Sequence, residues 1–278
     1  MKAPPINLEA RLRGITAKLD RAETLHQLVQ RRGDAWVSDE RSWEIIPDPK
    51  PEKRRIIVSL RLVREAPIEL SILLDEVVHH LSSALDLLAT YLVLWSRGPE
   101  GRAEWPTVRT AEQWETDIDI PCGGPLAGAD PSVRDFVRCH QPFSTGVDPD
   151  HDSLILLRDL WNAYKHRTLS PIRIQAKGEA AFSDLFHPTT EIEPTHFKWL
   201  LRPTAADELQ RGSARKLALM EFSPDDPFPK VIMRGEIPLK VFVGSGDGTG
   251  GGSLWDDLAR IRNIVRQATD KFPPQNCR

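Results

Sequence analysis

Cysteine is scarce in this chain of 278 residues, with three copies, Cys122, Cys139 and Cys277, that lie far apart and form no CxxC pair. So small and odd a number argues against a disulfide framework, and the missing pair spacing argues against a structural zinc site. An excess of one charge is also lacking, because 37 basic residues are nearly balanced by 40 acidic ones. The chain as a whole therefore has no strong attraction to nucleic acid or anionic lipid, although a local basic face remains allowed.

Long hydrophobic runs are missing too. The longest apolar stretch, around residues 81–95, is interrupted by Ser82, Ser83, Asp86 and Thr90, so it is too short and too polar to cross a bilayer. The first residues, MKAPPINLEARLRG, contain no apolar segment of the kind found in signal peptides. We therefore expect a cytoplasmic protein that does not contact a membrane.

Five segments have the periodicity of amphipathic helices, with apolar residues at three- and four-residue steps. The first begins after Asn7, a suitable N-cap, and is expected to end at Gly33. The strongest is residues 68–95, and the fourth begins after Asp150 or Asp152. The five predicted helices span residues 7–32, 68–95, 131–140, 152–168 and 254–268.

Strand patterns occur elsewhere in the chain. Residues 43–64 predict a β-hairpin, because residues 55–62 alternate between apolar and polar and the prolines of Pro47–Lys53 are typical of a turn. Four shorter strands are predicted at residues 172–176, 196–202, 216–222 and 231–243, whereas residues 97–133 are rich in glycine and proline and predict a loose excursion.

These elements predict an α+β fold, namely an antiparallel helical bundle with an inserted β-hairpin, a small antiparallel β region and a closing C-terminal helix. Residues 1–170 are expected to form the helical bundle domain, with the hairpin at 43–64. Residues 171–278 are expected to form the β-rich region and the last helix, packed on the first part as one unit.

Two motifs resemble cofactor or metal sites but lack the context that such sites need. Gly246, Gly248 and Gly251 match G-x-G-x-x-G, but no βαβ unit follows and the small polar residues around them suit a linker, so no cofactor is expected. Asp75 with His79 and Glu76 with His80 are i,i+4 pairs on one helix. A metal site would need three ligands converging on one point, and a polar helix face is the commoner explanation, so no metal is expected.

The segment LLRDLWNAYKHRTLS, residues 156–170, carries the sharpest functional signal. Arg158, Asn162, Lys165 and His166 share one side of a helical wheel. Arginine and lysine can hold a phosphodiester, and histidine can move a proton from a ribose 2′-hydroxyl, so the set could cleave RNA without metal. The alternative is that Lys165 and His166 only suit the negative end of the helix, and that Arg158 pairs with a nearby acid.

Two helical motifs also carry a resemblance. Asp75, His79, Leu81, Ser83, Ala84, Leu85 and Asp86 match the pattern D-x-x-H-x-L-R-S-A-L-D, and Leu157, Leu160, Asn162, Lys165, His166 and Arg167 match L-x-x-L-x-N-x-D-K-H-R. Over residues 7–175 the chain resembles a family of uncharacterised bacterial and phage proteins with these motifs. Its paired helices are also similar to HEPN-type nucleases and RNA-binding domains. It departs from the family pattern at Ser82 and Leu87, and seven residues separate Arg158 from His166, more than the HEPN signature has.

Two hypotheses follow for the function. The preferred one is a non-enzymatic interaction or scaffold protein, in which Asp75, His79 and Asp86 face Lys165, His166 and Arg167 as a satisfied polar seam between packed helices. The alternative is a metal-independent HEPN-like ribonuclease or RNA-binding protein with a toxin or phage-defence role. There His166 would be the general acid or base, Asn162 would orient it, and Arg158, Lys165 and Arg167 would hold phosphate. The expected partner is RNA or protein, and the nuclease hypothesis includes a homodimer, because such sites commonly form across one.

Overall fold

The computed structural model describes residues 7–39, 41–50, 55–96, 103–120, 124–146, 148–149, 152–166, 173–176, 197–199, 214–222, 239–242 and 254–274. The chain divides into two compact units. One, the helical unit, comprises Met1–Val29, Ser71–Ser170 and Gly251–Arg278. The other, the sheet unit, comprises Gln30–Leu70 and Pro171–Gly250. The hairpin segment therefore groups with the later strands, and the last helix groups with the earlier helices, unlike the division expected at residue 170.

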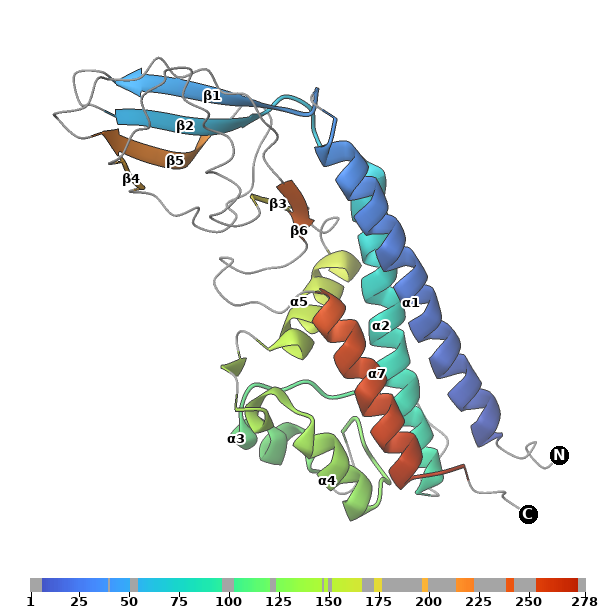
Figure 1. Cartoon of the computed structure of the whole chain (residues 1–278). Coiled ribbons are helices and arrows are strands. Elements are labelled where there is room, and N and C mark those ends of the chain that lie inside the picture. The colour runs from blue at the N-terminus through green and yellow to red at the C-terminus, as the bar shows by residue number, and fades with distance from the viewer. Residues whose placement is uncertain are drawn as a thin grey trace. The chain divides into compact units, whose positions relative to one another are not determined.

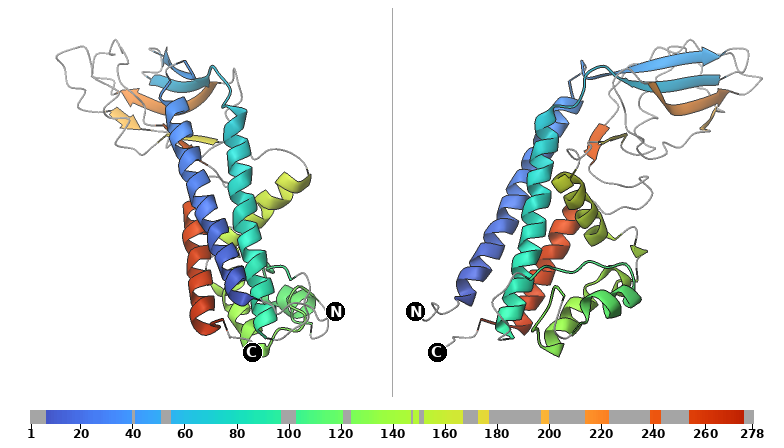
Figure 2. Two further views of the ribbon diagram at one scale, coloured as in Figure 1. Left: turned by 90° about the vertical axis from the view of Figure 1, so that its right-hand side faces the viewer. Right: turned by 180° about the vertical axis from the view of Figure 1, so that it is seen from behind.

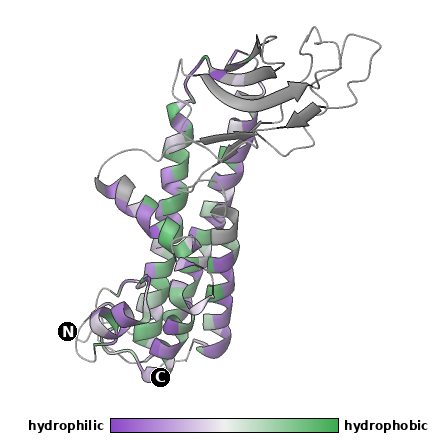
Figure 3. Ribbon diagram, turned by 90° about the vertical axis from the view of Figure 1, so that its left-hand side faces the viewer, coloured by the Kyte–Doolittle hydropathy of each residue, from purple (hydrophilic) through white to green (hydrophobic). Residues whose placement is uncertain are grey.

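Helices supply the whole framework of the helical unit. Within it, α1 and α2 lie side by side with α7, and the short α3 and α4 lie near one end of these long helices (Figures 1 and 2). The long helices carry apolar stretches next to polar ones, as expected for amphipathic helices around a shared core (Figure 3). The bounds are α1 Leu8–Val37, α2 Ile68–Trp95, α3 Ala111–Gln113, α4 Pro131–Cys139, α5 Ser153–His166 and α7 Leu254–Lys271, with a π-helical turn at Trp114–Ile118 and a 3₁₀ turn at Pro142–Ser144.

The first helix begins as predicted and ends later than predicted. The Asn7 side chain accepts a hydrogen bond from the backbone N–H of Ala10 at 2.9 Å, which confirms the N-cap. The expected stop at Gly33 is wrong, because α1 continues to Val37. A glycine costs a helix interior only about 1 kcal/mol relative to alanine. Buried Trp36, beyond the glycine, lies within the continued helix.

Helix α2 is the core helix, and its predicted bounds are confirmed. Leu74, Val78, Leu81, Leu88 and Leu92 are fully buried along one stripe. By length and composition α2 is the one helix in the described part of the chain that could cross a membrane, yet 61% of its apolar window is buried inside the protein. A long apolar helix that is mostly buried is typical of the core of a soluble protein.

The sheet unit contains a four-stranded antiparallel sheet with the order β1-β2-β5-β4, and a separate pair of β3 with β6. Pro47 and Pro49, expected in the turn, lie within β1, opposite Val58 and Ile56 of β2. Proline is tolerated there because β1 stands at the edge of this sheet, where a missing N–H costs no ladder hydrogen bond. The bounds are β1 Trp43–Lys50, β2 Arg55–Leu62, β3 Arg173–Ala176, β4 Phe197–Trp199, β5 Ala214–Phe222 and β6 Leu239–Phe242.

The predicted α+β class is wrong for the core of this protein. The helical unit has no strand among its described residues. An α+β domain needs helices and sheet to share one core. Here the strands fall into the other unit, so the unit that carries the candidate site is all-helical. The predicted glycine tract, residues 244–253, lies outside the described residues.

Candidate functional site

An open pocket of about 220 Å³ lies in the helical unit where α2, α5 and the segment of residues 103–107 meet. It brings together four of the predicted site residues, Asp86 from α2 and Arg158, Asn162 and Lys165 from α5. The remaining lining residues are Ser82, Leu85, Glu104, Trp105, Thr107, Leu154, Leu157 and Trp161. One of the predicted α2 residues and three of the predicted α5 residues therefore meet at one place.

Asp86 holds the segment of residues 103–107, here called the linking segment, against α2. Its Oδ1 accepts a hydrogen bond from the backbone N–H of Trp105 at 3.0 Å, and the Thr90 hydroxyl, one turn later, donates to the carbonyl of Ala103 at 3.3 Å. A carboxylate that accepts a backbone N–H satisfies a donor that would otherwise be costly to bury. Asp86 thus builds one wall of the pocket.

Arg158 fastens the same segment to α5. Its Nη1 donates to the carbonyl of Thr107 at 2.9 Å, while Nε and Nη2 donate to Oδ1 of Asp159 at 3.2 and 3.0 Å. Arg109, from just beyond the pocket, donates to Oδ2 of the same carboxylate at 3.2 Å. The guanidinium of Arg158 is therefore engaged on both of its donor edges, with its side chain 31% exposed.

Lys165 and Asn162 line the pocket, and both are exposed. The ammonium of Lys165 lies 4.4 Å from the centroid of the Trp161 ring, which is the geometry of a cation–π contact. Asn162 is exposed. His166 is the last residue of α5 and only its backbone is described, and Arg167 lies outside the described residues, so the predicted contact between Asn162 and His166 stays a prediction.

The predicted seam of Asp75, His79 and Asp86 is not a continuous wall of this pocket. Asp75 is buried, with 2% of its surface exposed, and it does not line the pocket. The His79 ring lies 5.1 Å from the Trp161 ring and 5.5 Å from the His80 ring. Burial, followed by the charges of Lys18 and Lys165, lowers the pKa of His79 below its usual value of 6.5, so this imidazole is neutral at pH 7.

The two tryptophans of the pocket are the residues that the sequence reasoning missed as site residues. Trp105 is 7% exposed, and its indole N–H has no hydrogen-bond acceptor in the described part of the chain. A buried donor left unpaired costs about 1–3 kcal/mol. The signal that could have pointed to it is the EWPTV segment, where an isolated Trp-Pro pair stands in a polar linker.

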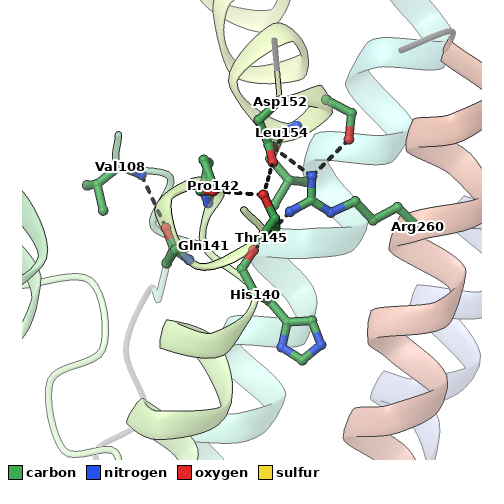
Figure 4. A network of polar contacts seen from close by, with 9 residues as sticks. Val108, His140, Gln141, Pro142, Thr145, Asp152, Leu154 and Arg260 are labelled. Atoms are coloured by element: carbon green, nitrogen blue, oxygen red, sulfur yellow. Dashed lines mark hydrogen bonds and ion pairs between the residues drawn. The ribbon is translucent and has the colours of Figure 1, made fainter. Parts of the chain in front are cut away.

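A second polar network fixes the start of α5 and so positions the pocket (Figure 4). The buried Asp152 accepts the backbone N–H of Leu154 at 2.9 Å, which confirms it as the helix cap, and Arg260 of α7 donates to it at 2.7 Å. Arg260 also reaches the His140 carbonyl at 3.2 Å. Beside it, the fully buried Gln141 accepts the backbone N–H of Val108 at 3.2 Å, so the linking segment is held here as well.

No metal centre is assembled by the described residues, among which no three His, Cys, Asp or Glu side chains converge. The i,i+4 pairs on α2 therefore lack a third described ligand.

No family model matches the chain, and neither a curated protein nor a solved structure matches it at a significant level. The pocket and its surroundings are therefore the features that bear on function.

Proposed function

We propose that this chain is a non-enzymatic interaction module of the cytoplasm, and that its helical unit holds a partner at the pocket between α2, α5 and residues 103–107. The observation that carries the proposal is the engagement of Arg158. Three of its donor contacts go to Thr107 and Asp159, so the residue that a nuclease would use to hold phosphate instead fastens the pocket wall.

The pocket also has the features of a binding site. It is open, it is lined by two tryptophans, and the buried indole N–H of Trp105 remains without an acceptor among the described residues. Small concave sites with aromatic walls and a few placed polar groups are the usual form of a ligand pocket. Asn162 and Lys165 line the pocket and are exposed, so they can contact what enters.

The test combines an activity assay with stability. Purified protein should leave single-stranded RNA intact in EDTA, and Arg158→Ala should lower the free energy of unfolding by about 1 kcal/mol, because the Thr107 carbonyl loses the donor that Arg158 supplies and Asp159 keeps only Arg109. Arg266→Ala is the matched control, since Arg266 is exposed on α7 and bonds only Asn263 of its own helix among the described residues.

The alternative of a metal-independent ribonuclease makes the opposite prediction. RNA degradation in EDTA that disappears in His166→Ala, with folding unchanged, would replace the proposal by that alternative. If Arg158→Ala is as stable as Arg266→Ala, the proposal of an interaction module loses its main support.

A further inference from the structure

The pocket between α2, α5 and the linking segment already holds an ammonium group of the chain itself. The ammonium of Lys165 lies 4.4 Å from the centroid of the Trp161 ring, and both residues line the pocket. The negative face of an indole attracts a cation more strongly than the rings of tyrosine or phenylalanine do. The aromatic wall of the pocket is therefore a binding position for an ammonium.

The ring that Lys165 covers is also in contact with α2. The centroids of the Trp161 and His79 rings lie 5.1 Å apart. Burial, followed by the charges of two lysines, lowers the pKa of His79, so this imidazole is neutral at pH 7 and brings no positive charge to the indole. The contact therefore positions the ring and leaves its attraction for a cation in place.

The charges that line the pocket balance while Lys165 is in place. Two carboxylates, Asp86 and Glu104, stand against two cations, Arg158 and Lys165. Without the ammonium of Lys165, the lining has one negative charge in excess. The pocket as a whole therefore favours a single positive charge at the position that Lys165 occupies, and it disfavours an anion.

Arg158 cannot take over the place of Lys165, because its donors are directed elsewhere. Its Nε and Nη2 donate to Asp159 at 3.2 and 3.0 Å, and its Nη1 donates to the carbonyl of Thr107 at 2.9 Å. Asp159 also accepts from Arg109 at 3.2 Å. Asp159 and Arg109 do not line the pocket, and their charges cancel, so the count of the lining stands. Lys165, exposed and on a flexible stem in the last turn of α5, is the cation that can leave.

We propose that the pocket binds a lysine side chain of a protein partner, whose ammonium takes the place of Lys165 over Trp161. The inference names the partner group that the interaction module holds, and so it rests on the proposed function. The pocket is also lined by Leu85, Leu154 and Leu157, against which the methylene groups of the incoming stem can pack. Lys165 then moves into solvent, and the charges of the lining remain balanced.

The experiment is an NMR titration of the full chain, followed at the indole N–H signals of Trp105 and Trp161. The probes are the blocked peptide acetyl-Gly-Lys-Gly-amide, its counterparts with Gln or Glu in place of Lys, and butylammonium chloride. We expect the lysine peptide to shift both signals until they saturate, and the other two peptides to leave them in place. We also expect it to bind more tightly than butylammonium, whereas equal binding would overturn the assignment to a peptide and leave a site for free amines.

Removing the chain's own ammonium should strengthen binding. In Lys165→Ala the competitor and its like charge are gone, so the lysine peptide should bind ~2–5-fold more tightly, which corresponds to one exposed cation–π contact. Lys271→Ala is the matched control, because Lys271 is exposed and lies 5.5 Å from the centroid of the Phe272 ring, outside the pocket lining. It should leave the affinity unchanged.

Removing a carboxylate should have the opposite effect. Glu104→Gln leaves the lining with one negative charge fewer, so the lysine peptide should bind ~2–5-fold more weakly, the upper range for one exposed charge contact. Glu112→Gln on α3 is the control, because Glu112 is exposed as Glu104 is and does not line the pocket. Both side chains are exposed, so neither change should disturb the fold.

The outcomes separate this proposal from the proposed function. Unchanged or weaker binding in Lys165→Ala overturns the exchange, and so does the failure of every probe to bind the folded protein. A preference for the glutamate peptide overturns the cation site. None of these results makes the chain an enzyme or alters the role of Arg158, whereas the proposed function fails through RNA cleavage or an unaltered stability of Arg158→Ala, which involve no lysine peptide.

Discussion

Arg260 on α7 donates to Asp152 at the start of α5, with 2.7 Å between Nη1 and Oδ1. The Asp152 side chain is 2% exposed and also accepts from the backbone N–H of Leu154 and the hydroxyl of Thr145. One carboxylate thus joins the last helix to the helix that carries the pocket. The partners are 108 residues apart, so this ion pair connects segments of the helical unit that are distant in sequence.

Removing Arg260 should lower the free energy of unfolding. Arg260→Met leaves the buried carboxylate of Asp152 without its cation, and the loss of one partner from a buried pair costs about 3 kcal/mol or more. Urea unfolding of the full chain measures this, with Arg266→Met on the exposed side of α7 as the control. Equal stability of the two variants would show that Asp152 does not need Arg260.

Tyr91 anchors the end of α7 to α2. Its buried hydroxyl donates to the Phe272 carbonyl at 2.6 Å, and Trp95, one turn later, donates to the carbonyl of Pro273 at 2.9 Å. Burial raises the pKa of Tyr91 to about 12, so the hydroxyl stays a donor over the whole working pH range. Tyr91→Phe keeps the ring and should lower the free energy of unfolding by about 1–2 kcal/mol.

Hydrogen exchange should locate the effect of Tyr91→Phe. The amide of Phe272, which donates to the Ala268 carbonyl at 2.8 Å, should exchange faster, whereas amides in the middle of α5 should change less. An equal increase in exchange rate at all amides of the helical unit would mean that the hydroxyl supports global stability and has no local role.

Local patterns predicted the helices well and their ends less well. The apolar stripe of α2 is buried as expected, and the caps Asn7 and Asp152 are found in place, because each of these depends on residues a few positions apart. Gly33 did not end α1, since neighbouring contacts outweigh a cost of about 1 kcal/mol. The Arg260–Asp152 pair could not be predicted, because nothing local links residues so distant in sequence.

The fold class failed for a similar reason. Alternation of apolar and polar residues in 55–62 indicates a strand, but it does not say against which core the strand packs. The site residues were predicted in part. Asp86, Arg158, Asn162 and Lys165 share a pocket, yet the tryptophan that walls it, Trp105, comes from a linker whose position depends on four long-range hydrogen bonds.

His26 makes stability depend on pH. It lies in α1 with 7% of its surface exposed, and burial lowers its pKa from 6.5 to about 4. The unfolded chain therefore binds a proton between these two values that the folded protein does not, so stability is full above pH 6.5 and is lost as pH falls. His79 and His80 act in the same direction, because their pKa values are lowered too.

A variant isolates the part of this pH dependence of stability that comes from His26. Between about pH 7.5 and about pH 5, the free energy of unfolding of the unaltered chain should fall by about 2 kcal/mol more than that of His26→Leu, which keeps an apolar side chain in the buried position and removes the titrating group. Urea unfolding across this range measures both slopes. Because the comparison cancels the contributions of His79 and His80, parallel slopes for the two proteins would mean that the imidazole of His26 is protonated as readily in the folded state as in the unfolded one.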